Sequence, residues 1–215
     1  MAWQAVKALV AQGRKAEAIR LAESSRSRWS SAFDIDQLCE GILLSSGLFD
    51  EAYAKYGLSA NQRGTYLATF RAVAKKYPAK STNVILADLA TTTPGEEGKW
   101  FAAAKSVSLY EEALALAAQS PGDPRTLTRA ARDFSEKEPR FALGAGLLAL
   151  HWLVEGYGYE ITGDDVKAAY DWTMKAAMQH GSTAEVEKKI RRMVAAETFG
   201  ERFVSKILAS QLGLG

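Results

Sequence analysis

The stretch LVAQGRKAEAIRLA at residues 9–22 returns in degenerate form as LLSSGLFDEAYAKY at residues 43–56. Gly13 matches Gly47, Ala18 matches Ala52, and the two alanines are 52 − 18 = 34 residues apart. In each copy an apolar run ends near the glycine and a second run follows, as expected where one helix ends and the next begins. A period of about 34 residues is typical of two-helix repeats, in which each hairpin buries its apolar face against a neighbour. The sequence therefore predicts an all-α fold of stacked antiparallel helical hairpins.

The same turn recurs more weakly further along the chain. In AKSVSLYEEALALA at residues 104–117, Ala113 stands at the alanine position and Ser108 replaces the turn glycine. In a fainter fourth copy, Ala142 stands at the alanine position, shortly after Pro139, and there is no turn glycine. A small side chain at the alanine position lets one helix approach the next closely, which gives the pattern a packing reason.

The repeat pattern divides the chain into two regions. Residues 1–57 hold the two clear copies and are predicted to form helical hairpins. Residues 58–215 are predicted to continue them as a helical repeat or bundle. Residues 198–212 carry an apolar stripe, so we expect a capping helix there, with a dimerisation helix as the alternative. The stripe consists of Phe199, Phe203, Ile207 and Leu208.

The composition is that of a folded, water-soluble protein. Of 215 residues, 47% are hydrophobic and 24% are charged, and the formal net charge is +2. The single cysteine, Cys39, excludes an intramolecular disulfide framework. The first residues do not have the pattern of a secretion signal, and the uncharged run at residues 141–154 is too short to span a bilayer. We therefore expect a cytoplasmic protein without a membrane partner.

Capping residues mark the expected helix boundaries. Four pairs have the spacing of a capping box, which satisfies two free amides at a helix start. They are Ser59 with Gln62, Thr93 with Glu96, Thr162 with Asp165, and Ser182 with Glu185. Pro94 and Pro124 fit the first helical position, and Asp123 is expected to cap the helix that follows it. Glycines after apolar runs are expected at helix ends, namely Gly13, Gly47, Gly57 and Gly181. Residues 157–161 are expected to form a loop.

The residues around the two clear turns resemble the second half of a tetratricopeptide-type unit. They are Gly13, Ala18, Gly47, Phe49, Ala52 and Tyr56. Only one of Trp3 and Asp36 is the aromatic expected early in the first helix, and the usual closing proline is absent at Ser30 and Gly64. The resemblance covers about the first 60 residues and residues 104–117. It implies stacked hairpins that bind a protein or peptide, and it assigns no binding residues. The second half, from Ala60, resembles an uncharacterised bacterial helical domain, which implies no function.

Residue types that support catalysis or cofactor binding are scattered along the sequence. His151 and His180 lack a second ligand at the spacing of a helical zinc site. Residues 93–100 (TPGEEGKW) contain a Gly-Lys pair but lack the earlier glycine and the following Ser or Thr of a phosphate-binding loop. Cys39 has no histidine near it in sequence and is expected to be a buried structural thiol.

Three acids near residue 162 also have an ordinary structural interpretation. Glu160, Asp164 and Asp165 surround the start of an expected helix, where acidic side chains stabilise the helix dipole. The sequence thus indicates no catalytic residue, no cofactor and no metal site. An enzyme whose site is assembled from distant residues is kept as an alternative.

The strongest binding signal is a basic stretch. Residues 58–80 hold five basic residues and no acid. On a helix from about residue 60 to 77, Arg63, Arg71 and Lys75 would share one face. Such a stripe fits contact with phosphate or an acidic partner, although a solvated helix face has the same pattern. The predicted partner-binding residues are Arg63, Arg71, Lys75 and Lys76.

These observations favour a non-enzymatic helical-repeat scaffold that binds a protein or peptide, with an acidic partner suggested by the basic stretch. The first alternative is a nucleic-acid-binding helical repeat. It requires the basic stripe to continue onto other helices, for example at Arg125, Arg129 and Arg132. An enzyme is the second alternative.

Overall fold

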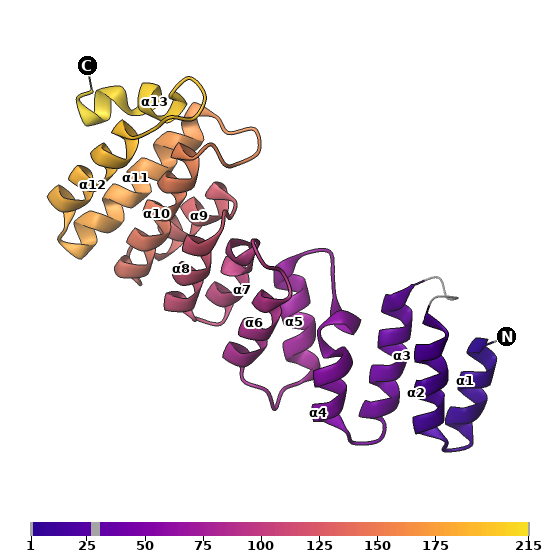
Figure 1. Cartoon of the computed structure of the whole chain (residues 1–215). Coiled ribbons are helices and arrows are strands. Elements are labelled where there is room, and N and C mark those ends of the chain that lie inside the picture. Colours follow the sequence, from indigo (N-terminus) through magenta and orange to yellow (C-terminus); the bar gives the residue numbers. More distant parts are fainter. Residues whose placement is uncertain (1, 27–30, 215) are drawn as a thin grey trace. The chain divides into compact units, whose positions relative to one another are not determined.

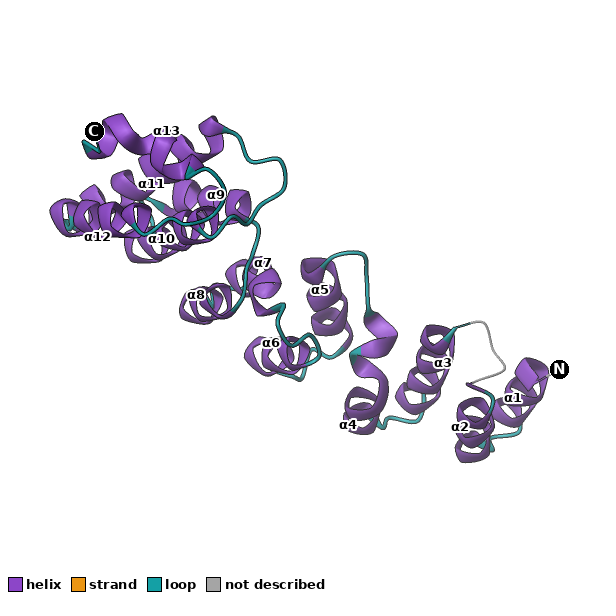
Figure 2. Cartoon of the chain, turned by 45° about the horizontal axis from the view of Figure 1, so that its top comes forward, coloured by secondary structure: helices purple, strands orange, loops and turns teal. Residues whose placement is uncertain are grey.

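The computed structural model describes residues 2–26 and 31–214, and these residues form helices, turns and loops without a strand (Figures 1 and 2). The chain consists of two compact units, unit 1 (Met1–Leu89) and unit 2 (Ala90–Gly215). Residue 57, where the sequence suggested a boundary, lies inside unit 1. No helix in the described ranges is both long enough and apolar enough to cross a membrane.

Unit 1 contains α1, α2, α3, α4, α5 and most of α6. Their bounds are Ala2–Ala11, Lys15–Ser24, Ala32–Leu44, Phe49–Ala52, Tyr66–Lys76 and Thr82–Thr91. A π-helical segment, Tyr53–Gly57, extends α4, and a short 3-10 helix, Ser59–Asn61, follows it. Helices α1 to α4 contact one another in chain order as antiparallel neighbours (Figure 1).

Unit 2 contains α7 to α13, preceded by the 3-10 helix Glu97–Trp100. The bounds of its helices are Phe101–Ser106, Tyr110–Gln119, Pro124–Phe134, Pro139–Val154, Gly163–His180, Thr183–Ala195 and Phe203–Leu212. The uncharged run at residues 141–154 lies in α10, which packs against α8, α9, α11 and α12. Gly146 brings α10 close to α11, because a Cβ at this position would lie 2.2 Å from Thr173 Oγ1.

Three turns have the backbone geometry that the sequence pattern predicts. Gly13 and Gly47 adopt left-handed φ values of 75° and 72°, and Ser108 adopts φ 59° without being glycine. In each turn the following residue donates its amide to a carbonyl five residues earlier. The three bonds are Arg14 N to Leu9 O (2.9 Å), Leu48 N to Leu43 O (3.0 Å) and Leu109 N to Ala104 O (3.1 Å). The replacement at Ser108 therefore preserves the turn while placing a side chain in a conformation that favours glycine.

The alanine after each turn is fully buried. Ala18, Ala52 and Ala113 are each 0% exposed, and so is Ala142, at the position of the faint fourth copy. The amide of each alanine donates to the carbonyl of the residue just before its helix, at 2.9 or 3.0 Å. No left-handed residue marks the fourth turn, so the buried alanine is the feature that all four share.

Two expected helix caps are confirmed. Asp123 accepts the amides of Arg125 and Thr126 with Pro124 in the first helical turn. Thr162 and Asp165 form a reciprocal capping box at the start of α11. Gly181 ends α11 with φ 74°, and residues 157–161 form a loop as expected.

Three expected capping pairs are wrong, each because another partner takes the side chain or the helix starts elsewhere. Ser59 lies in the 3-10 helix, and α5 is capped by Thr65, whose Oγ1 accepts the Ala68 amide. Thr93 begins a turn through Pro94, and its hydroxyl accepts the Trp100 indole N–H at 2.8 Å. Ser182 makes no capping bond and instead shares a 3.2 Å hydrogen bond with the His180 ring.

Gly57 ends a helical segment as expected, although its backbone differs from that of Gly13 and Gly47. It has no positive φ and lies in the π-helical segment, where a Cβ would meet the rings of Tyr53 and Tyr77 at 3.1 to 3.3 Å. A glycine at this helix end therefore also allows the close packing of two tyrosines.

The last helix begins later than the sequence suggested. α13 starts at Phe203 rather than near residue 198, and Phe199 is 60% exposed. The buried carboxylate of Glu197 accepts the amides of Val204 and Ser205 at 3.0 and 2.7 Å, which fixes this start. The buried residues of α13 are Val204, Leu208 and Leu212, so the apolar stripe is displaced from the expected one. α13 packs on α10, α11 and α12.

The turns at Ser108 and Gly47 predict opposite changes in stability when serine and glycine are exchanged. Ser108→Gly removes left-handed strain of about 1 kcal/mol, partly offset by the greater freedom of glycine in the unfolded chain. We expect the free energy of unfolding to rise by about 0.5 kcal/mol. Gly47→Ser at the equivalent turn is expected to lower it by about 1 kcal/mol, because space is available there but φ is left-handed. Urea unfolding followed by circular dichroism measures both changes. A loss of stability in Ser108→Gly would contradict the claim that Ser108 is strained in its left-handed conformation.

Candidate functional site

The structure separates the four basic residues predicted to bind a partner. Arg71 and Lys75 lie one turn apart on α5 and both are exposed. Arg63 precedes the helix, which begins at Tyr66, so the expectation that it shares their face is wrong. Its amide donates to Thr69 and its guanidinium donates to the carbonyl of Gln62.

Lys76 belongs to a buried polar network. Its ammonium lies 2.5 Å from Oε2 of Glu40, a side chain that is 0% exposed. Glu40 Oε1 also accepts hydrogen bonds from Asn61 and from the Tyr77 hydroxyl. Burial, followed by the hydrogen bond to Glu40, raises the pKa of Tyr77 far above its usual value. Lys76 thus neutralises a buried carboxylate, a structural role that the sequence did not predict.

The residues weighed for catalysis are Cys39, the two histidines and the acids near residue 162. Among the described residues, no three His, Cys, Asp or Glu side chains are grouped so that they could hold a metal ion. Cys39 is buried, and burial raises the pKa of its thiol. The His151 ring lies 4.5 Å from the Trp152 ring, centroid to centroid, and is tilted by 55° to it.

A groove in unit 2 brings together three arginines over an apolar floor. It lies between α9 and α11, has a volume of about 250 Å³, and is floored in part by Leu153 of α10. The cationic lining consists of Arg125, Arg129 and Arg132 of α9, and Asp165 is the acid among the lining residues. The apolar lining consists of Pro124, Leu153, Ile161, Ala168 and Trp172.

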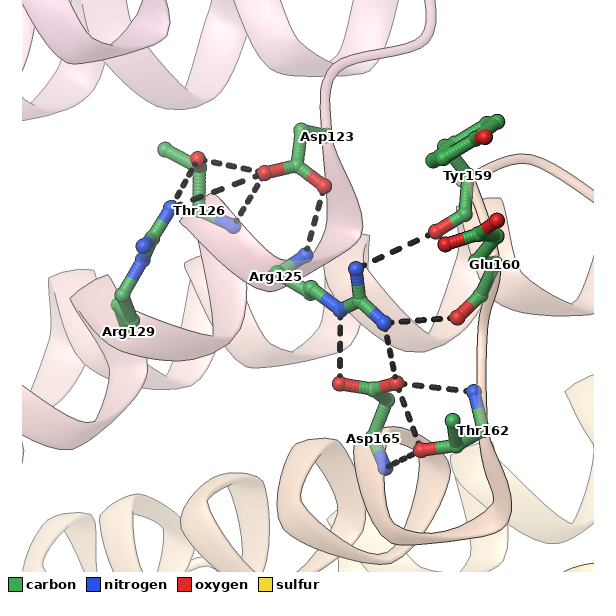
Figure 3. Close-up of polar contacts among 8 residues, drawn as sticks. All are labelled: Asp123, Arg125, Thr126, Arg129, Tyr159, Glu160, Thr162 and Asp165. Atoms are coloured by element: carbon green, nitrogen blue, oxygen red, sulfur yellow. Dashed lines mark hydrogen bonds and ion pairs between the residues drawn. The ribbon is translucent and has the colours of Figure 1, made fainter.

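Arg125 fastens α9 to the start of α11 (Figure 3). Its Nε and Nη2 donate to the two carboxylate oxygens of Asp165, each at 2.9 Å. Its Nη1 and Nη2 also donate to the carbonyls of Tyr159 and Glu160 at 3.2 and 2.7 Å. Bidentate arginine–carboxylate pairs are among the stronger and more directional polar contacts in proteins. Arg125 is therefore part of the frame of the groove.

The contacts of Arg125 with Asp165 and the two loop carbonyls, called the clamp below, hold a loop with unusual backbone geometry. Between α10 and α11, Gly156, Gly158 and Glu160 all have positive φ values of 83°, 116° and 47°. The Tyr159 carbonyl points toward Arg125 while its ring points away, and the side chain is 79% exposed (Figure 3). A non-glycine residue with positive φ persists only where surrounding contacts enforce it, and here the hydrogen bond from Arg125 to the Glu160 carbonyl supplies one.

Arg129 and Arg132 are bound much less completely than Arg125. Arg129 Nη2 donates to Thr126 and lies 3.7 Å from a carboxylate oxygen of Asp123. Arg132 Nε donates to Asp133, its neighbour in sequence, at 2.7 Å. Within the described structure, the other guanidinium nitrogens of these two residues have no protein partner. The groove therefore offers two guanidinium groups with donors available to a ligand.

Asp165 stays ionised in this setting. The hydrogen bonds from the Arg125 guanidinium hold the pKa of its carboxyl well below the usual range, against the opposing effect of burial. The same interaction raises the pKa of Arg125. Both Asp165 oxygens are occupied, one by Arg125 alone and the other by Arg125 and Thr162. This carboxylate is a fixed structural anion.

The sequence contained signals for each side of the groove but no sign that they face each other. Arg125, Arg129 and Arg132 recur at helical spacing, as do Asp165, Ala168 and Trp172. From the sequence, the three arginines are expected only as an extension of a nucleic-acid-binding stripe. The role of the loop carbonyls has no sequence signal, because backbone oxygens are present at every residue.

Comparison of the chain with protein-family models, with curated proteins and with solved structures finds no match.

The ion pair between Lys76 of α5 and the buried Glu40 of α3 gives a matched prediction. Lys76→Met leaves the buried Glu40 carboxylate without its cation, and we expect the free energy of unfolding to fall by about 2 kcal/mol. Lys75→Met, at the adjacent exposed lysine, is expected to change it by less than about 0.5 kcal/mol. Urea unfolding of the two variants measures the difference. Equal effects would contradict a special role for Lys76.

The clamp predicts a pH-dependent contribution to stability. Because the folded pKa of Asp165 is depressed, its contribution is present above its unfolded pKa of about 4 and is lost as the pH falls through the folded value. At pH 7 we expect Asp165→Asn to lower the free energy of unfolding by about 1–2 kcal/mol. The gap between wild type and variant should shrink between pH 5 and pH 2.

The control is Asp164→Asn, at an exposed acid in the same helical turn. Thermal unfolding at several pH values follows both variants. A gap for Asp165→Asn that is constant over this pH range would show that its carboxylate is not held ionised by Arg125.

Proposed function

We propose that this chain is a non-enzymatic, tetratricopeptide-like helical-repeat protein that binds a protein or peptide partner. Support for the repeat comes from three turns that each contain one residue in the left-handed conformation and the same type of backbone hydrogen bond. Their spacing to a fully buried alanine is also the same. A scaffold of this kind presents side chains from successive helices on one surface, which suits recognition of an extended partner.

The α9–α11 groove is the proposed contact site. The observation that carries this assignment is the pairing of two incompletely bound arginines with an apolar floor, on a frame that Arg125 already fixes. A rigid frame lowers the entropy lost when a partner binds. Arginine and tryptophan are also the side chains that most often dominate binding energy at interfaces.

The groove supports binding better than catalysis. Its titratable lining consists of arginines, which stay protonated, and an aspartate whose oxygens are both hydrogen-bonded. A general base needs a free acceptor near neutral pKa, and this lining offers none. We further propose a cytoplasmic location, because the single cysteine, Cys39, is a free buried thiol.

A nucleic-acid ligand is favoured less than a protein or peptide. Each arginine of the groove has a carboxylate beside it, at Asp165 for Arg125, Asp123 for Arg129 and Asp133 for Arg132. A nucleic-acid backbone, with a phosphate at every nucleotide, is normally met by a continuous basic surface. The exposed pair Arg71 and Lys75 on α5 is kept as a separate candidate contact.

The test is a capture experiment from nuclease-treated source lysate with immobilised wild-type protein and three double variants. We expect a discrete protein that wild type retains and that Arg129→Glu/Arg132→Glu loses. The matched control is Lys188→Glu/Lys189→Glu, which makes the same change of charge at exposed positions on α12 and should retain it. Arg71→Glu/Lys75→Glu reports on α5. Circular dichroism first establishes that all four proteins are equally helical.

Other outcomes redirect the proposal. Loss of the protein only in Arg71→Glu/Lys75→Glu moves the contact to α5 and refutes the groove as the site. Retention of no protein, together with a salt-sensitive mobility shift of a labelled oligonucleotide, contradicts protein binding and supports the nucleic-acid alternative.

A further inference from the structure

We infer that the α9–α11 groove takes a short acidic peptide in which one large apolar side chain lies beside two carboxylates. The inference rests on the proposed function and specifies its ligand. It follows from the number of available cations, the shape and chemistry of the floor, and the charges beside each arginine.

The available cations set the number of anionic groups. The Arg125 guanidinium already binds both oxygens of Asp165 and two loop carbonyls. Arg129 and Arg132 remain, one helical turn apart on α9, with side chains that are 59% and 49% exposed. Two guanidinium groups of this kind suit two carboxylates, each bound in the planar, bidentate manner that arginine favours.

The floor sets the apolar element. Leu153 is buried, and Ile161, Ala168 and Trp172 are partly covered at the wall of the groove. A volume of about 250 Å³ accommodates one large aliphatic or aromatic side chain. An apolar side chain seated there would exclude water from the neighbouring guanidinium groups and strengthen their contacts with carboxylates.

The local acids distinguish a short peptide from a polyanion. Asp133 is about half exposed, so a competing carboxylate can displace it from Arg132 at little cost. Asp123 lies 3.7 Å from Arg129 and keeps its place as the cap of α9. Both acids remain close to the groove and repel further negative charge. The site therefore tolerates two anionic groups and disfavours the closely spaced phosphates of a nucleic acid.

Asp133 provides a variant that should gain affinity. It binds only the neighbouring Arg132 among the polar contacts in the described structure, whereas Asp123 also caps α9. Asp133→Asn frees the Arg132 guanidinium without removing a cap. We expect this variant to bind the acidic peptide about two- to five-fold more tightly, which corresponds to the strength of an exposed ion pair.

The experiment is a selection from a random 12-residue peptide library on the full-length wild-type chain. Selected peptides are then labelled with fluorescein, and their affinities are measured by fluorescence anisotropy. We expect two Asp or Glu residues near one Phe, Trp, Leu or Ile. Affinity should fall at least ten-fold for Arg129→Glu/Arg132→Glu and stay unchanged for Lys188→Glu/Lys189→Glu.

Two further variants test the apolar element. Trp172→Ala removes part of the wall, and Thr128→Trp fills the groove from α9 without removing a buried side chain. Each should weaken binding about ten-fold while leaving the helical signal unchanged. Unaltered affinity in Thr128→Trp would overturn the seating of a side chain in the groove, whatever the folding of Trp172→Ala.

The remaining outcomes separate this inference from the proposed function. Peptides that bind wild type and Arg129→Glu/Arg132→Glu equally would overturn the acidic-peptide inference and leave peptide binding intact. A selection that enriches no peptide, with tight binding of a fluorescein-labelled 20-nucleotide single strand at low salt, would overturn both.

Discussion

A small side chain at a helix contact lets two helices approach closely, and in this chain a fully buried alanine follows each of four turns. Ala18, Ala52, Ala113 and Ala142 are all completely buried. A larger residue would separate the paired helices and disturb the apolar contacts on both sides. The left-handed residue before three of these alanines reverses the chain so that the second helix starts in register. The fourth turn lacks that residue, which identifies the buried alanine as the stricter requirement.

The groove depends on this frame in unit 2. α10 is buried along much of its length and fixes α9 and α11 beside it. With the two helices held, Arg125 reaches Asp165 and the loop carbonyls without a search over many conformations. The clamp in turn fixes the loop and leaves Arg129 and Arg132 at the rim. One arginine thus has a structural role and its two neighbours remain available for a ligand, although all three look alike in sequence.

Local signals predicted the fold well where a short segment determines the outcome. The turns at Gly13 and Gly47 and the caps at Asp123 and Thr162 depend on residues within a few positions. Predictions failed where a distant group competes. The Trp100 indole takes the Thr93 hydroxyl, and Lys76 pairs with Glu40, a carboxylate 36 residues earlier whose burial no local pattern indicates. The groove was likewise hidden, because helical spacing shows which residues share a face but not which faces meet.

The most direct measurement is nuclear magnetic resonance of the arginine side-chain Nε–Hε groups during titration with a peptide selected on wild type. Single arginine-to-lysine variants assign the three signals of α9. Arg129 and Arg132 should shift as the peptide binds, whereas Arg125 should show slow hydrogen exchange before titration and little change after it. Shifts at Arg71 with unchanged signals from Arg129 and Arg132 would contradict the account, because the partner would then bind α5 and the groove would be only a packing feature of unit 2.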